Sequence, residues 1–316
     1  MARLHEDETL VEIEGVNGDV VTISGPGQGK EGFELLAGGW QDLYDIPFTT
    51  IYTQHAFEQG ATYNGMRIER RLPLIKVIAN ATRSQKWKVV DERWAELWSP
   101  LADTKLWVDD GDSRRHLLIR QLEHMRVDLQ YDPNGEQSTV IETPGVSGNP
   151  WWWEPSVFDT WVSPVSTIGV DEYGDPKTAI GTVTVSNPTP YPIWVKWRLQ
   201  AGPSAGTKWH LPDFSWGNKA HRRAVEDATR VIHMPALLAN EHIDIDTDEL
   251  VKGRPQVVST LDTQIYLRME GKTFMYPLPP RLDPVEVPVA VQGAPAGVGL
   301  RVECPRPWPR PWGQRR

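Results

Sequence analysis

A glycine-rich loop near the start of the 316-residue sequence contains residue types that could bind a phosphate group. The pair Gly29-Lys30 resembles the end of a phosphate-binding loop, in which backbone N–H groups and a lysine contact the phosphates. However, Ser24 occupies the position of the required earlier glycine, and Glu31 stands where a serine or threonine would bind magnesium. The sequence therefore predicts an ordinary flexible loop.

The segment HIDIDTDE resembles the opening of a calcium-binding loop, because Asp244, Asp246 and Asp248 alternate along it. A calcium loop needs a glycine for its sharp turn and a bidentate glutamate near its end. Glu249 and Pro255 occupy these two positions. We therefore expect a strand with a solvated carboxylate edge.

The other nucleophiles and metal ligands lack the local spacing that catalysis or metal binding needs. The single cysteine, Cys304, excludes an intramolecular disulfide, and no G-x-S-x-G motif is present. No two histidines have the i, i+4 spacing of a helix or the H-x-H spacing of a strand that binds metal. We therefore predict no enzyme activity, no cofactor and no metal site. The eight histidines are His5, His55, His116, His124, His210, His221, His233 and His242.

The composition of the chain limits the kinds of partner that it is expected to bind. The formal net charge is -9 and no large basic block occurs, so sequence-specific binding to nucleic acid is not expected. The least charged stretch, residues 287–300, is interrupted by prolines and glycines, and the first ten residues carry charges where a secretory signal would be apolar. We expect no membrane association and synthesis in the cytoplasm.

The first half of the chain, residues 1–142, is predicted to be a β domain with one helix. Alternating apolar residues on both sides of Asn17-Gly18 predict a hairpin. An amphipathic helix is expected from about residue 84 to residue 98, because Trp87, Val90, Trp94 and Leu97 recur at helical spacing. Trp98 lies one step off this apolar stripe and is expected to reach outward.

Residues 143–156 are predicted to be an interdomain linker, because proline, glycine and adjacent tryptophans replace any periodic pattern there. Short strand candidates separated by turn residues recur over residues 157–303, which is typical of a jelly-roll β-sandwich. The predicted fold class is thus mainly β. The last segment, residues 304–316, is rich in proline, tryptophan and arginine, and we expect an extended tail.

The fifteen tryptophans are candidates for contact surfaces. Trp151, Trp152 and Trp153 are adjacent and cannot all point inward in regular structure, so at least one is expected to contact protein or stack on a sugar. Packing of the linker between domains is the alternative. Trp209 and Trp216 are further candidates for sugar stacking. Trp308 and Trp312 could anchor the tail to a partner, although a functionless tail is an equal alternative.

The order of these motifs resembles that of the distal tail protein family of long-tailed phages, called minor tail proteins in actinobacterial phages. In the first half the resemblance rests on YNGMRIERRLPLIKVIA, QKWKVVDERWAELWSPL and KLWVDDGDSRRHLLIRQLEHMRVDL. In the second half it rests on NPWWWEP, TVTVSNPTPYPIWVKWRL, KWHLPDF, HIDIDTDE and RPWPRPWG.

The resemblance implies a structural component of the virion tail tip, assembled in the host cytoplasm. An N-terminal β-barrel-like or split-barrel-like domain would form a ring, usually a hexamer, and a C-terminal galectin-like jelly roll would face outward. The ring would lie between the tail tube protein and the baseplate hub and leave a channel for DNA. Tyr63, Arg70 and Trp98 are our candidates for the contact between neighbouring subunits.

Two functions of other classes stay open at this stage. One is a carbohydrate-binding protein that recognises a host cell-wall glycan through the tryptophans named above. The other is a glycosidase, because a catalytic pair of carboxylates is brought together by the fold and leaves no local spacing in the sequence.

Overall fold

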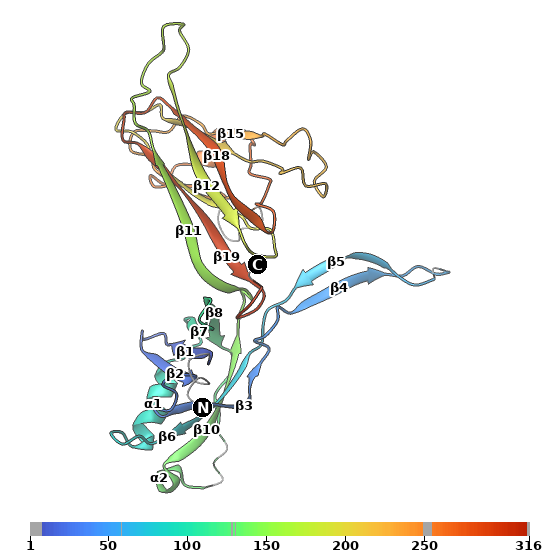
Figure 1. Cartoon of the computed structure of the whole chain (residues 1–316), viewed down its shortest axis with the longest axis vertical. Coiled ribbons are helices and arrows are strands. Elements are labelled where there is room, and N and C mark those ends of the chain that lie inside the picture. The colour runs from blue at the N-terminus through green and yellow to red at the C-terminus, as the bar shows by residue number, and fades with distance from the viewer. Residues whose placement is uncertain (1–7, 58, 128, 130, 249–254, 315–316) are drawn as a thin grey trace. The chain divides into compact units, whose positions relative to one another are not determined.

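The structure is a computed structural model that describes residues 8–57, 59–127, 129, 131–248 and 255–314. It divides into two compact units. Unit 1 consists of Met1–Glu154 and Trp308–Gly313, and unit 2 consists of Pro155–Pro307 and Gln314–Arg316. Strands dominate both units (Figure 1), which confirms the prediction of a mainly β fold. No helix in the described ranges is long and apolar enough to cross a membrane.

Unit 1 contains two antiparallel layers around one core. In the first layer β2 pairs with β1, β1 with β7 and β7 with β8; in the second, β10 pairs with β6 and β6 with β3. The end of β8 also pairs with β10, which joins the layers. The strands are β1 (Leu10–Glu14), β2 (Val20–Ser24), β3 (Phe33–Gln41), β6 (Leu74–Asn80), β7 (Thr104–Asp109), β8 (Arg114–Gln121), β9 (Arg126–Val127) and β10 (Ser138–Val146).

The core of unit 1 follows from the alternation in these strands. In β6 and β7 every second residue is buried, as expected for strands with one face on a core. Helix α1 (Trp87–Glu96) adds Val90 and Trp94 to this core, and Leu97 follows directly after the helix. The helix is thus shorter than predicted, and a second helix, α2 (Pro133–Glu136), is a single turn before β10.

Unit 2 is a sandwich of two antiparallel sheets. One sheet has the order β12-β18-β14-β15, and the other contains β17-β16-β13-β19-β11. Apolar residues from both sheets form one core. The elements are β11 (Trp152–Val162), β12 (Thr178–Asn187), β13 (Lys196–Leu199), β14 (Lys208–Pro212), β15 (Val231–His233), β16 (Ile243–Asp246), β17 (Val257–Ser259), α3 (Ile265–Arg268), β18 (Leu282–Gln292) and β19 (Gly299–Trp308).

The segment predicted as a linker is regular structure instead. Residues 143–146 belong to β10, and residues 152–156 belong to β11, within which the chain leaves unit 1 after Glu154. The sequence showed no periodicity here because several residues in a row are buried in β10, where Pro144 and Gly145 interrupt the alternation. Burial on both faces removes the polar half of the pattern.

The predicted extended tail is also regular in its first part, since β19 continues through Trp308. Prolines occupy every second position from Pro305 to Pro311. Alternate N–H groups of a strand point to opposite neighbours, so all the missing donors fall on one edge. The register with β13 ends at Glu303, and no β13 residue needs a donor beyond it. The alternation therefore permits a strand that a random placement of the same prolines would prevent.

Two buried arginines hold the end of the chain in unit 1. Arg71 is fully buried and donates to the carbonyl oxygens of Pro150 (2.7 Å), Asp45 (2.5 Å), Asp42 (3.3 Å) and Pro309 (2.7 Å). Burial lowers the pKa of Arg71 to about 10, and the nearby carboxylates of Asp42 and Asp45 oppose the shift. The group therefore stays charged near neutral pH, with carbonyl dipoles in place of water.

Arg115 acts in the same way a few residues further along the tail. Its guanidinium donates to Glu154 Oε1 (3.0 Å) and to the carbonyl oxygens of Arg310 (2.9 Å) and Gly313 (2.8 Å). It also lies 4.1 Å from the centre of the Trp308 ring. Residues 308–313 are therefore an integral part of unit 1.

Glu241 is the corresponding buried charge of unit 2. Its carboxylate is fully buried and accepts hydrogen bonds from Leu238 N (2.8 Å), Ser259 Oγ (2.9 Å), Thr263 and Arg268. Burial by itself would raise the pKa of Glu241, but these donors outweigh it and lower the pKa to about 2. The ionised form is therefore the one that the fold stabilises.

Replacement of Arg71 by methionine should lower the free energy of unfolding of unit 1 by about 3 kcal/mol, because buried carbonyl oxygens lose their donor. Arg67→Met is the matched control, since the Arg67 side chain is 70% exposed, and its effect should stay within about 0.5 kcal/mol. Urea unfolding followed by hydrogen exchange of unit 1 peptides measures both. Equal stability of the two variants would show that the Arg71 contacts contribute nothing.

The lowered pKa of Glu241 gives unit 2 a defined acid sensitivity. Its contribution to stability is complete above the unfolded pKa of about 4.5 and is lost as the pH falls toward about 2. Glu241→Gln should cost about 2 kcal/mol at pH 7 and should flatten the loss of stability between pH 4.5 and pH 2. The control is Glu270→Gln, whose carboxylate is mostly exposed. Unfolding curves of the two variants with the same pH slope would contradict this account.

Candidate functional site

The tryptophans do not form an exposed contact surface. All fifteen are buried or half-buried. Trp98, expected to reach outward, is 5% exposed and packs 5.7 Å from Trp94 in the core of unit 1. It therefore cannot form a subunit contact, and this prediction was wrong. The helix ends at Glu96, so the chain turns there and places Trp98 inward.

The three adjacent tryptophans divide between inside and outside as a strand requires. Trp152 is fully buried and donates from Nε1 to the carbonyl oxygen of Leu43 (3.1 Å), so it is not available to a sugar or a partner. Trp151 and Trp153 are half-buried. The side chains of a strand alternate between its faces, which explains why the middle residue differs from its neighbours.

The tail tryptophans are likewise internal to unit 1. Trp308 is fully buried, which contradicts its predicted role as an exposed anchor. Trp312 is half-buried and stacks on Trp40, with ring centres 6.2 Å apart. The Arg310 side chain next to it pairs with Asp45 (2.7 Å). The hydrogen bonds of Arg71 and Arg115 hold the backbone here, so these indoles complete the core of their own chain.

The exposed apolar surface of unit 1 lies on a hairpin, which we call the arm. It consists of β4 (Phe48–Thr53) and β5 (Thr62–Ile68), which pair only with each other among the described strands. Figure 1 shows the arm extending away from the other strands of unit 1. Its exposed apolar side chains are Phe48, Ile51, Tyr52, Phe57, Tyr63 and Met66.

The arm contains one of the predicted contact residues. Tyr63 is 55% exposed and packs edge-on against Tyr52, with ring centres 5.5 Å apart. Arg70 is exposed and follows the end of β5. An isolated two-stranded hairpin is at best marginally stable in water. The arm therefore has the properties of a segment that is completed by another molecule.

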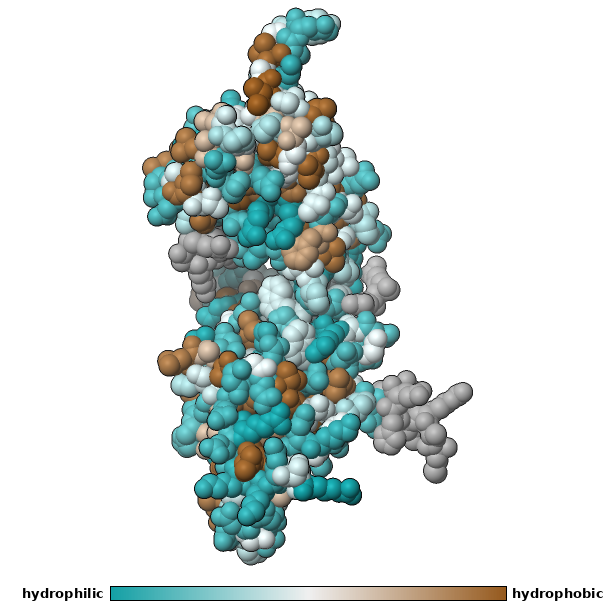
Figure 2. Space-filling view, turned by 90° about the vertical axis from the view of Figure 1, so that its left-hand side faces the viewer, coloured by the Kyte–Doolittle hydropathy of each residue, from teal (hydrophilic) through white to brown (hydrophobic). Residues whose placement is uncertain are grey.

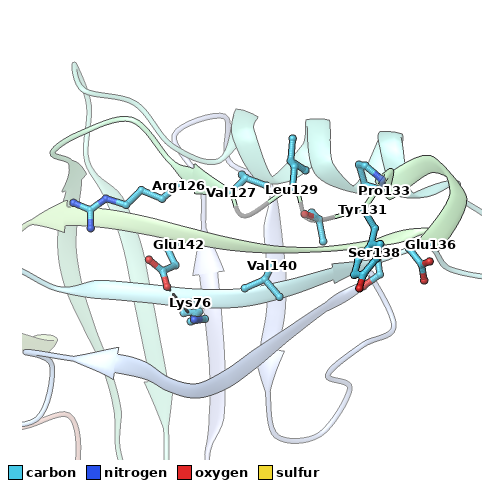
Figure 3. A pocket seen from close by; sticks show the side chains of 11 residues that line it. Lys76, Arg126, Val127, Leu129, Tyr131, Pro133, Glu136, Ser138, Val140 and Glu142 are labelled. Atoms are coloured by element: carbon cyan, nitrogen blue, oxygen red, sulfur yellow. Dashed lines mark ion pairs between the residues drawn. The ribbon is translucent and has the colours of Figure 1, made fainter.

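A groove of about 780 Å³ lies beside β10 in the same unit. Figure 3 shows Val127 and Leu129 on the segment that runs along one side, with Val140 and the Lys76–Glu142 ion pair (2.9 Å) on the strands below. Tyr131, which is also exposed, completes the apolar part of the lining. Val127, Leu129 and Tyr131 occupy alternate positions of the sequence, which is the signal that could have indicated an apolar face here.

Comparison with known proteins gives the context of these surfaces. No family model matches the chain. The minor tail protein Gp27 of Mycobacterium phage D29 is 26% identical over 345 residues, covering 97% of this chain and 98% of the relative. The minor tail protein Gp27 of Mycobacterium phage L5 matches with the same identity and coverage. Over nearly its whole length the chain is thus similar to minor tail proteins of phages.

A solved structure shares the fold of this chain. The crystal structure of the Dit protein (gp 19.1) of SPP1, described as a paradigm of the hub adsorption apparatus in phages that infect Gram-positive hosts, has a TM-score of 0.56. The match covers 94% of this chain and 98% of that chain at 10% identity. At this identity the likeness concerns the fold. The family predicted from the sequence motifs is therefore confirmed.

In unit 2, the tryptophans predicted to stack on a sugar differ in burial. Trp209 is fully buried and donates from Nε1 to the carbonyl oxygen of Gln200 (2.8 Å). Trp216 is half-buried and packs edge-on against Phe214, with ring centres 5.7 Å apart. The Trp209 ring therefore presents no open face of the kind that stacks on a sugar.

The aspartates of HIDIDTDE form ion pairs with the neighbouring strand. Asp244 on β16 pairs with Arg198 on β13 (2.5 Å), and Asp246 pairs with Lys196 (3.3 Å). Opposite charges that face each other across two strands stabilise the pairing. Within the described ranges, no group of three or more His, Cys, Asp or Glu could hold a metal ion.

The loop between β11 and β12 is the most exposed apolar segment of unit 2. It projects at the top of Figure 1, and Figure 2 shows hydrophobic side chains among hydrophilic ones along it. Tyr173 is 83% exposed, and Ile168 and Val170 are also exposed. Asp171 accepts hydrogen bonds from the backbone N–H groups of Tyr173 and Asp175 (2.9 Å each), so the tip is an ordered turn.

Replacement of Trp209 by alanine should lower the stability of unit 2 by about 3–5 kcal/mol, because it leaves a large cavity in the core. Tyr173→Ala is the control, since it removes an exposed ring and should cost less than about 0.5 kcal/mol. Thermal and urea unfolding measure both variants. A stable Trp209→Ala variant that loses binding to a cell-wall glycan would restore the sugar-stacking interpretation.

Proposed function

We propose that this protein is a structural component of the tail tip of a long-tailed phage, where its copies form a ring that joins the tail tube to the baseplate hub. The observation that carries the proposal is the match to phage minor tail proteins over nearly the whole chain. The Dit fold supports it independently of sequence identity. A hexamer with a central channel for DNA is the form that the family resemblance favours.

The arm is the element that we propose joins neighbouring copies. Its strands have no partner beyond each other in the described part of unit 1, and its apolar side chains face solvent. Contiguous exposed apolar residues mark interaction surfaces. A closed ring needs heterologous contacts, in which one patch of each subunit meets a different patch of the next. The arm supplies one such patch.

The groove beside β10 is the second patch, and we propose that it receives the arm of a second copy. Val127, Leu129 and Tyr131 offer an apolar wall, and the arm offers aromatic and aliphatic side chains of matching character. Both surfaces belong to unit 1, so one unit contains both halves of the contact. The role is structural, since assembly of this kind requires no catalytic group.

Replacement of Tyr52, Tyr63 and Met66 by serine should weaken self-association at least tenfold, because the exposed apolar area of the arm is lost. The control replaces Ile168, Val170 and Tyr173 by serine, which removes comparable exposed area from unit 2. Native mass spectrometry over a range of concentrations, with and without the tail tube protein, measures the oligomers. Circular dichroism confirms that each variant is folded.

The groove is tested by Leu129→Ser combined with Tyr131→Ser. If the arm binds in this groove, the groove and arm variants should not be additive, because each removes the same contact. If the losses in self-association are additive, the arm binds to a surface other than this groove. That result would not contradict the proposed ring. A chain that stays a monomer at every concentration with the tube protein present would refute the ring itself.

A further inference from the structure

The fold brings together two histidines that are far apart in the sequence. His210 on β14 and His233 on β15 are directly opposed in the antiparallel register of the four-stranded sheet. Their Nδ1 atoms are 2.5 Å apart, and the ring planes meet at 74°. This pair has no signal in the sequence, because the metal-binding spacings known from sequence are local to one helix or strand.

The two Nδ1 atoms face each other across the space between the rings. Between neutral imidazoles only one of two facing nitrogens carries a proton, and the other accepts it. When both rings carry their proton on Nε2 instead, two lone pairs converge on one point. Converging imidazole nitrogens are the donor set that Zn²⁺, Ni²⁺ and Cu²⁺ prefer. His233 is exposed and His210 is half-buried, so an ion has access from solvent.

We propose that His210 and His233 form a two-histidine chelate for a late first-row divalent cation on the outer face of the four-stranded sheet. A metal–nitrogen bond of about 2.0–2.1 Å requires the two nitrogens to separate to about 2.9–3.3 Å, for square or tetrahedral angles. Small rotations of two side chains on the sheet surface supply that change. Water occupies the remaining coordination positions. This site is independent of the proposed ring.

The surroundings of the pair set the pH at which it binds. Burial lowers the pKa of His210, and the neighbouring His233 lowers it further, which favours the neutral imidazole. Lys208 on the same strand also lowers this pKa and repels a cation moderately. Gln292 on β18 opposes these effects. Its amide nitrogen donates to Thr178 (2.9 Å), which leaves its oxygen able to accept from His210 Nε2.

Such an acceptor would orient the ring for metal binding. Metal-ligating histidines usually donate their second N–H to a neighbouring oxygen, which fixes the tautomer. Within the described residues, His210 Nε2 is buried and has no hydrogen-bond partner of good geometry. A metal on Nδ1 would place the proton on this nitrogen, and a small shift of Gln292 would then satisfy it.

The test is titration of the full chain with Cu²⁺ and separately with Zn²⁺ at pH 7.5, followed by calorimetry. We expect one ion per chain, bound at least tenfold more tightly than by His233→Ala. The matched control is His124→Ala, which removes an exposed histidine of unit 1 and should bind as the unaltered chain does. Binding should weaken between pH 7.5 and pH 5, because protons compete with the metal ion for imidazole nitrogen.

Spectroscopy of the copper complex tests the two histidine ligands directly and does not depend on protein stability. Electron paramagnetic resonance of the Cu²⁺ complex should show two imidazole nitrogens in the unaltered chain and at most one in His233→Ala. Because His233 is exposed, that variant should retain the fold, and His233→Gln provides a second check. Equal affinity of the unaltered chain and His233→Ala, or a copper spectrum without two imidazoles, would overturn the proposal.

Discussion

The buried guanidinium of Arg71 is the interaction on which the closure of unit 1 depends. A charge removed from water is tolerated only when its donors are satisfied, and here carbonyl oxygens from residues 42, 45, 150 and 309 supply the acceptors. These residues come from three separate parts of the chain, so the group fixes all of them together. Residues 308–313, which the sequence predicted as part of an extended tail, thereby belong to the first unit.

The distribution of aromatic residues also follows from which side chains the fold can bury. Indole rings remove a large apolar area from water, and the two cores take Trp94, Trp152, Trp209 and Trp308 completely. The tyrosines and phenylalanines of the arm remain exposed because, among the described strands, no third strand pairs with β4 or β5. The aromatic surface available for assembly is therefore on the hairpin that no further described strand covers. The number of tryptophans in the sequence does not predict where this surface lies.

Local pattern predicted the elements that have one buried face. The alternation in β1 and β2 and the apolar stripe of α1 identify their positions, because an exposed face keeps polar residues at a regular period. Pattern failed where this contrast is absent. Residues 143–146 of β10 are mostly buried, and β19 contains alternating prolines, so both were interpreted as irregular segments.

The sequence by itself determined the mainly β class, the principal helix and the family, since these depend on periodicities of a few residues and on the order of motifs along the chain. Only the tertiary structure decided which aromatic rings are exposed, how Arg71 meets Pro309, and that His210 faces His233. The physical reason is the separation along the sequence of the residues that interact. A backbone period is fixed by neighbouring residues, whereas a contact between residues 71 and 309 exists only after the strands between them have packed.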